Sequence, residues 1–142
     1  EIWNSEECIT ELALEKTSVK VNQPEDILIA MYGATIGKLG ILKFEATTNQ
    51  ACCACTPFEG MNNKYLFYFL MSHKEKFIEG SEGGAQPNIS KTKIINTPFP
   101  LPPTQEQNRI VAKLDEIMAI CDQMESILNE NSEVNIALKV AE

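Results

Sequence analysis

The sequence is poor in positive charge and contains no long apolar run. Twelve lysines and arginines stand against 20 aspartates and glutamates, which gives a formal net charge of −8. This acidic balance argues against a protein that covers nucleic acid with a broad basic surface. No apolar stretch approaches the ~18 residues of a membrane span. We therefore expect no membrane partner, and any basic face must be local.

The charges are unevenly distributed along the chain. Residues 1–32 contain 2 lysines and 7 acids, and residues 105–142 contain 3 basic and 8 acidic residues. Residues 33–104 alone have a positive balance, with 7 lysines against 5 acids. A contact with nucleic acid is therefore expected only in this middle segment.

Histidine occurs once, at His73, and the five cysteines are Cys8, Cys52, Cys53, Cys55 and Cys121. An odd number of cysteines makes a poor disulfide framework and favours a reducing, cytoplasmic location. Cys52 and Cys55 form a C-x-x-C pair, but a structural zinc needs four ligands and no second pair exists. Residues 50–56 are small and apolar, so we expect a strand interior with buried cysteines, and no metal or cofactor. A catalytic pairing of one of these thiols with His73 would lack the exposed, electropositive setting that a nucleophile needs.

Proline and glycine are absent after Thr104, whereas four prolines precede it at positions 98, 100, 102 and 103. Prolines so closely spaced require an extended segment. Thr104 and Gln107 have the spacing of a capping box, in which each side chain satisfies a backbone N–H near the other residue. We therefore predict one continuous helix over residues 105–142, roughly 57 Å long at 1.5 Å per residue. The chain would divide into a globular part, residues 1–103, and a helical part, residues 104–142.

The predicted helix has apolar residues in a heptad pattern, at Ile110, Leu114, Ile117, Cys121, Met124 and Leu128. A second line comprises Val111, Met118 and Ile127. The remaining residues are too few to cover this stripe, so we expect its outer part to pack on a second long helix. Asn131 and Asn135 occupy seam positions, where polar residues either fix the register of pairing or mark a fraying end.

The globular part is predicted to be α+β, a small mixed sheet with packed helices. A helix is expected from Asn4 and Glu7 to about Lys16. The apolar run at residues 27–32 predicts a strand buried on both faces. Further strands are expected at residues 41–44 and 50–56, and a core helix capped by Asn63 is expected to end near residue 79.

Two glycine-rich loops are the candidates for ligand contact. Residues 33–40 contain three glycines and Lys38, in a pattern that does not match a nucleotide-binding P-loop. Residues 80–90 form a long polar loop, followed by two lysines. Amides suit adenine, and lysine and serine suit phosphates. A second interpretation remains open, in which Asn88 and Ser90 only cap the next turn and hold the loop in place. The candidate DNA-binding residues are Tyr32, Thr35, Lys38, Gln86, Asn88, Ser90, Lys91 and Lys93.

Five segments, in order, resemble the specificity subunit of type I restriction-modification enzymes. They are residues 27–40 (ILIAMYGATIGKLG), 48–53 (TNQACC), 63–70 (NKYLFYFL), 83–90 (GGAQPNIS) and 100–111 (PLPPTQEQNRIV). The chain resembles the later part of one target recognition domain followed by the conserved helical region. Because the family's domain begins well before Glu1, we expect a fragment of a longer subunit, or a half-length subunit that works as a homodimer.

The resemblance implies a protein without catalysis of its own. In that family, two recognition domains each read half of a split double-stranded DNA target, and two long helices pair antiparallel to hold them apart. DNA adenine methyltransferase subunits, and through them the restriction subunit, assemble around this scaffold. An alternative is a purely structural assembly module, with a dimerising helix and no DNA binding of its own.

Overall fold

A three-stranded antiparallel sheet lies at the centre of the computed structural model, which describes residues 1–79 and 88–140, with side chains to residue 130. Its middle strand is β2 (Ile27–Ala30), paired with β3 (Leu39–Ile41) and β5 (Cys52–Cys55). Ile27 and Ile29 are fully buried and Leu28 is 9% exposed, so the predicted burial on both faces is confirmed for these residues. The strand ends at Ala30, before residue 32, and Tyr32 is 46% exposed.

A second, smaller sheet pairs β1 (Val21–Asn22) with β4 (Ala46–Thr47) in antiparallel register. A parallel bridge joins Ile2 to Leu42. With the helices described below, these small sheets confirm the predicted α+β class. The strand predicted at residues 41–44 is instead Leu39–Ile41, because the Gly-rich loop before it closes within residues 33–38, and only the isolated bridge at Leu42 follows it.

The predicted core helix over residues 63–79 is broken into α2 (Asn63–Ser72) and α3 (Lys74–Glu79). The break lies at His73, where the carbonyl of Phe69 accepts from both the Ser72 hydroxyl (2.8 Å) and the His73 N–H (3.2 Å). Such side-chain competition for a backbone carbonyl interrupts regular helix. The N-cap is Asn62 rather than Asn63, since its side chain accepts from the N–H of Tyr65.

The prediction of the first helix was wrong at its start. The helix α1 spans Glu11–Lys16, and its cap is Thr10, whose hydroxyl accepts from the Ala13 N–H at 3.1 Å. The Ser5 hydroxyl donates to the Glu7 carbonyl, which forms a local turn where the helix was expected to begin. No residue of α1 is buried, so the predicted apolar face has nothing to cover.

The hydrophobic core joins the sheet to α2, α3 and the segment before α4 (Lys91–Asn96). Leu70 and Phe77 pack from the helices, and the fully buried Ile89 packs from the segment before α4. The proline segment after α4 has no regular secondary structure, as predicted. Its Phe99 lies edge-on to Phe69, with ring centroids 4.7 Å apart.

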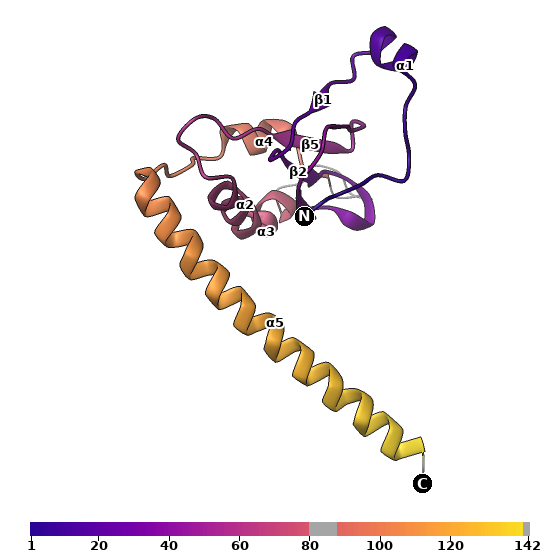
Figure 1. Ribbon diagram of the computed structural model, residues 1–142, viewed down its shortest axis with the longest axis vertical. Coiled ribbons are helices and arrows are strands. Elements are labelled where there is room, and N and C mark those ends of the chain that lie inside the picture. Colours follow the sequence, from indigo (N-terminus) through magenta and orange to yellow (C-terminus); the bar gives the residue numbers. More distant parts are fainter. Residues whose placement is uncertain (80–87, 141–142) are drawn as a thin grey trace.

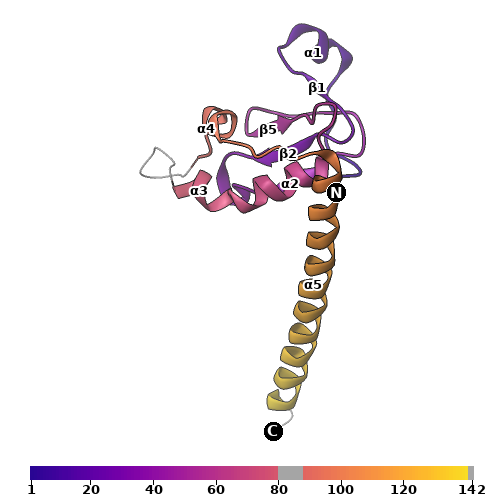
Figure 2. The same ribbon diagram turned by 90° about the vertical axis from the view of Figure 1, so that its left-hand side faces the viewer.

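The last element, α5 (Thr104–Val140), is a single helix of 37 residues, about 55 Å long at 1.5 Å per residue. The prediction of one continuous helix is confirmed over these residues. Figures 1 and 2 show α5 leaving the globular part beside α2 and running away from it. Residues 116–130, which form much of the outer half of this rod, are all exposed.

The predicted capping box at the start of α5 does not form. The Thr104 hydroxyl donates to the Gly60 carbonyl at 3.2 Å, and the N–H of Gln107 donates to the Pro103 carbonyl at 3.1 Å. The Gln107 side chain is 1% exposed and is directed into the globular part. Tertiary hydrogen bonds to the loop around Gly60 therefore replace the local ones that the sequence pattern predicts.

Candidate nucleic-acid interface

The first candidate loop is closed onto the end of β2. The N–H of Gly37 donates to the Ala30 carbonyl (2.8 Å), and the Ala30 N–H donates to the Lys38 carbonyl (2.9 Å). Gly33 and Gly37 have φ values of +72° and +73°, which only glycine adopts without strain. The loop therefore has a defined shape. Its side chains Tyr32, Thr35 and Lys38 are all exposed.

The second candidate loop is held by Ile89, whose side chain is fully buried. Its N–H donates to the Met31 carbonyl at 2.8 Å. Ser90 is the N-cap of α4, but its side chain makes no capping bond. Among residues 1–79 and 88–130, the side chains of Asn88 and Ser90 make no hydrogen bond, and the loop is held instead through the backbone of Ile89. Gln86 lies outside the described residues.

The hydrogen bond from Ile89 to Met31 brings the two candidate loops together. Tyr32 directly follows Met31, and Asn88 directly precedes Ile89, so both flank this bond. Lys38 is tied to the neighbouring Ala30. Seven of the eight predicted residues thus belong to two segments anchored at the same end of β2. They come from residues 32–38 and 88–93.

Lys91 extends this group toward β5. The pKa of Cys53 is lowered, chiefly by its interaction with the Cys55 side chain and then by the charge of Lys91. The same interaction raises the pKa of Cys55, and burial raises that of Cys52. The strand predicted at these cysteines is confirmed. His73 does not join them but stacks at 4.2 Å on Phe69. No cluster of three or more potential metal ligands occurs among the described residues.

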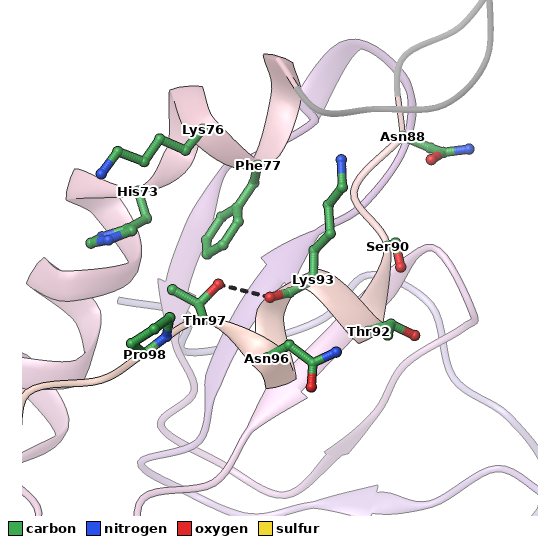
Figure 3. Close-up of a pocket in the computed structure, with 10 residues that line it drawn as sticks. All are labelled: His73, Lys76, Phe77, Asn88, Ser90, Thr92, Lys93, Asn96, Thr97 and Pro98. Atoms are coloured by element: carbon green, nitrogen blue, oxygen red, sulfur yellow. Dashed lines mark hydrogen bonds between the residues drawn. The ribbon is translucent and has the colours of Figure 1, made fainter.

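A pocket of about 710 Å³ separates α3 from α4 (Figure 3). Three predicted residues line it: Asn88 and Ser90 lie at its edge, and Lys93 extends from α4. Sequence reasoning missed the other polar residues of this pocket, which are His73, Lys76, Thr92, Asn96 and Thr97. Their polarity is visible in the sequence, but nothing local predicts that α3 and α4 face each other.

The root of α5 is attached to α2 by a polar cluster that sequence reasoning also missed. Asp115 accepts from the Lys64 ammonium at 2.8 Å and from the Tyr68 hydroxyl at 2.6 Å. The bond from Lys64, followed by that from Tyr68, lowers the pKa of Asp115. Burial, and then the bond to Asp115, raises the pKa of Tyr68 to about 12. The sequence does carry a signal for this cluster. Asp115 stands four residues after the apolar Val111, so the two residues share one face of the helix.

The predicted seam of α5 is largely exposed in this chain. Ile117 is 43% exposed, Met124 59% and Leu128 64%, and Cys121 is exposed as well. Ile110 and Leu114, nearer the globular part, are half-buried. Of the second line, Val111 is 6% exposed and packs inward, whereas Ile127 is 57% exposed. The described part of the chain thus carries an apolar stripe along the rod. It contains no helix long and apolar enough to cross a membrane.

Comparisons with curated proteins agree with these features. The chain is 30% identical over 118 residues to the EcoR124I/EcoR124II specificity subunit of Escherichia coli, which covers 80% of this chain and 29% of that protein. It is 28% identical over 115 residues to the MjaIX specificity subunit of Methanocaldococcus jannaschii, covering 80% and 26%. Both relatives are named type I restriction enzyme subunits, and this chain spans less than a third of either.

Solved structures share the fold. A chain from work described as "Structural basis underlying complex assembly and conformational transition of the type I R-M system" aligns with a TM-score of 0.69 at 27% identity, covering 79% of this chain and 27% of that one. The HsdS subunit from Thermoanaerobacter tengcongensis aligns with a TM-score of 0.63 at 26% identity, covering 74% and 25%. The family model described as "Type I restriction modification DNA specificity domain" matches residues 2–134. The chain therefore belongs to the family of type I restriction-modification DNA specificity domains.

Proposed function

We propose that this chain is the part of a type I specificity subunit that reads half of a double-stranded DNA target and holds it at a set distance from the other half. Residues 1–103 are the recognition part, and residues 104–142 are the spacer. The observation that carries the proposal is the Ile89 to Met31 hydrogen bond, because it joins the loop that carries Lys38 to the segment that carries Asn88 and Lys91.

The side chains on this edge divide by chemistry into two roles. Asn88, with Gln86 beside it in sequence, can donate to and accept from an adenine edge in the major groove. Lys38 and Lys91 are exposed point charges suited to backbone phosphates, which position the protein without reading sequence. Tyr32, Thr35 and Ser90 supply hydroxyls to either partner. Lys93, the last of the eight candidates, is a further lysine suited to a phosphate.

The exposed stripe on α5 is proposed as the surface for a second long helix. That helix belongs to the same subunit or to a homodimer mate, and the spacing between the two recognition parts follows from the length of the rod. DNA adenine methyltransferase subunits, and through them the restriction subunit, would assemble around this scaffold. The acidic character of residues 105–142 fits a surface that faces proteins rather than DNA. In this role the chain needs no catalytic residue.

The test of recognition replaces Asn88 by Ala in the intact subunit and measures methylation over a library of targets. We expect a changed preference, because one good bidentate base contact contributes about 1–3 kcal/mol of discrimination. The matched variant Lys38→Ala should weaken binding to all sequences alike and lower the salt slope by about 1. An unchanged target preference in Asn88→Ala would remove this loop from the reading surface.

A second candidate function is suggested by the exposure of Ile117 and its neighbours, namely a purely structural assembly module. Under this alternative, Leu114→Asp with Ile117→Asp abolishes self-association or methyltransferase binding, while DNA never shifts the wild-type chain in a gel. Under the first proposal, the same double variant still binds DNA through its loops. A gel-shift titration of wild type and double variant separates the two.

A further inference from the structure

The side chain of Lys74, the first residue of α3, lies across the first candidate loop. A Cβ placed on Gly37 would lie 2.7 Å from Cγ, 3.2 Å from Cδ and 3.0 Å from Cε of Lys74. Three successive carbons of the lysine therefore run along the backbone of Gly37, and a residue without a side chain leaves them room there. Gly37 is buried, whereas Thr35 and Lys38 in the same loop are exposed.

The contact covers the stem of Lys74 and leaves its charged end available. Lys74 as a whole is half-buried. Within the described part of the chain, its ammonium makes no hydrogen bond or ion pair and is not sealed from solvent. Lys43 and Lys64 are different, since each pairs with a carboxylate, at 2.7 Å and 2.8 Å. Lys74 is therefore fixed along its carbons but not at its charge.

A lysine held in this way is suited to bind an anion. A free lysine side chain loses rotamer freedom when its ammonium binds a partner, and this loss of entropy opposes binding. The contact with Gly37 restricts the same torsions before any partner arrives. Lys38, which follows Gly37 in the chain, adds a second exposed positive charge to this loop. Two positive charges at one loop attract an anion more strongly than either does alone.

We propose that Lys74 contacts a backbone phosphate of the DNA target beside the loop of residues 33–38, and that Gly37 positions it for this contact. The proposal rests on the proposed function and adds a lysine from outside the two candidate segments. Lysine binds phosphate as a point charge, so this contact positions the protein without reading sequence. Figure 2 shows α3 and α4, which begin with Lys74 and Lys91, at the same end of the globular part, away from the root of α5.

The first experiment measures duplex DNA binding by the intact subunit over a range of salt concentrations. Lys74→Met keeps most of the stem and removes the charge. It should weaken binding to all sequences alike and lower the slope of log affinity against log salt by about 1, the effect of one lost phosphate contact. Lys74→Arg keeps the charge and should keep the slope. Lys16→Met removes an exposed lysine of α1, which lies far from α3 in Figures 1 and 2, and should also keep the slope.

The second experiment tests whether Gly37 acts through Lys74. Gly37→Ala should displace the stem of Lys74 and weaken DNA binding. Combined with Lys74→Met, it should cost less affinity than the sum of the two single effects, because the charge that it misplaces is already absent. Gly33→Ala is the matched control, since Gly33 also has a positive φ but a Cβ there meets nothing within 4 Å. Its effect should add fully to that of Lys74→Met.

Each outcome of these experiments decides a separate point. An unchanged salt slope in Lys74→Met, with a lowered slope in Lys38→Ala, would overturn the contact of Lys74 and leave the proposed function standing. Full additivity of Gly37→Ala and Lys74→Met would overturn the role of Gly37. An intact subunit that binds no duplex DNA would overturn the proposed function and this contact together. Thermal unfolding checks that each variant is folded, and Lys74→Gln replaces Lys74→Met if the latter is not.

Discussion

The strongest stability prediction concerns Gln107, whose buried amide connects the rod to the globular part. Its Nε2 donates to the carbonyls of Gly60 (3.1 Å) and Pro102 (2.9 Å), and its Oε1 accepts from the N–H of Asn62 (2.8 Å). A neutral hydrogen bond contributes about 1 kcal/mol net, so Gln107→Ala should lower the free energy of unfolding by about 3 kcal/mol. This is a large share of the 5–15 kcal/mol typical of a domain.

The assay is urea unfolding combined with hydrogen exchange at one amide. With a urea dependence of about 1–3 kcal/mol per molar, the loss should lower the unfolding midpoint by at least about 1 M. The Asn62 N–H should be protected in wild type and exchange faster in Gln107→Ala, because its acceptor is gone. The matched control is Gln105→Ala, an exposed glutamine two residues earlier on the same helix, which should cost less than about 0.5 kcal/mol.

A second variant separates hydrogen bonding from packing at this position. Gln107→Met preserves most of the side-chain volume but cannot reproduce the three bonds, and it leaves the Asn62 N–H and two carbonyls without this partner. We expect it to be destabilised nearly as much as Gln107→Ala. If Gln107→Met were as stable as wild type, or if Gln107→Ala cost no more than Gln105→Ala, the reasoning from these bonds would be refuted.

Three further predictions test the loop, the helix root and the rod. Gly37→Ala should destabilise the chain by more than Gly33→Ala in thermal unfolding. Both substitutions cost about 1–2 kcal/mol of stability because the backbone φ is positive. Only at Gly37 would the new Cβ also lie 2.7 Å from Cγ of Lys74. Because the pKa of Tyr68 is raised to about 12, its contribution to stability is complete below pH 10 and is lost as pH rises through 12; Tyr68→Phe should abolish this alkaline loss in pH-dependent unfolding. Ile117→Asp should weaken self-association in sedimentation experiments without lowering the melting temperature, because its side chain is 43% exposed.

Sequence patterns that extend over many residues predicted the right elements. The apolar run at residues 27–32 and the uninterrupted stretch after Thr104 each repeat one physical signal over many residues, and both elements are present. The two candidate loops were recognisable from their glycine content. That they meet could not be predicted, because one backbone bond between Ile89 and Met31 joins segments 58 residues apart.

Short patterns failed where a distant partner competed with a local one. Thr104 and Gln107 have the spacing of a capping box, but the Gln107 amide instead accepts from the Asn62 N–H and donates to the Gly60 carbonyl, both more than 40 residues earlier. Asn4 and Glu7 likewise suggest a helix start, yet the helix begins only at Glu11, where Thr10 caps it, and none of its residues is buried. A motif of four residues records only what the local backbone allows, and the tertiary structure selects among the alternatives.

The geometry of α5 allows one helix to serve two neighbours at once. Val111 and Asp115 face α2 and are held there by burial and by the bonds from Lys64 and Tyr68. At 100° per residue, Ile117 lies roughly 120° around the helix from Val111. The exposed stripe therefore begins where the contact with α2 ends, and a second helix can pack along the rod without displacing the globular part. Because the first three turns of α5 are held by α2 and by the loop around Gly60, the direction of the rod is set by these two parts of the globular domain.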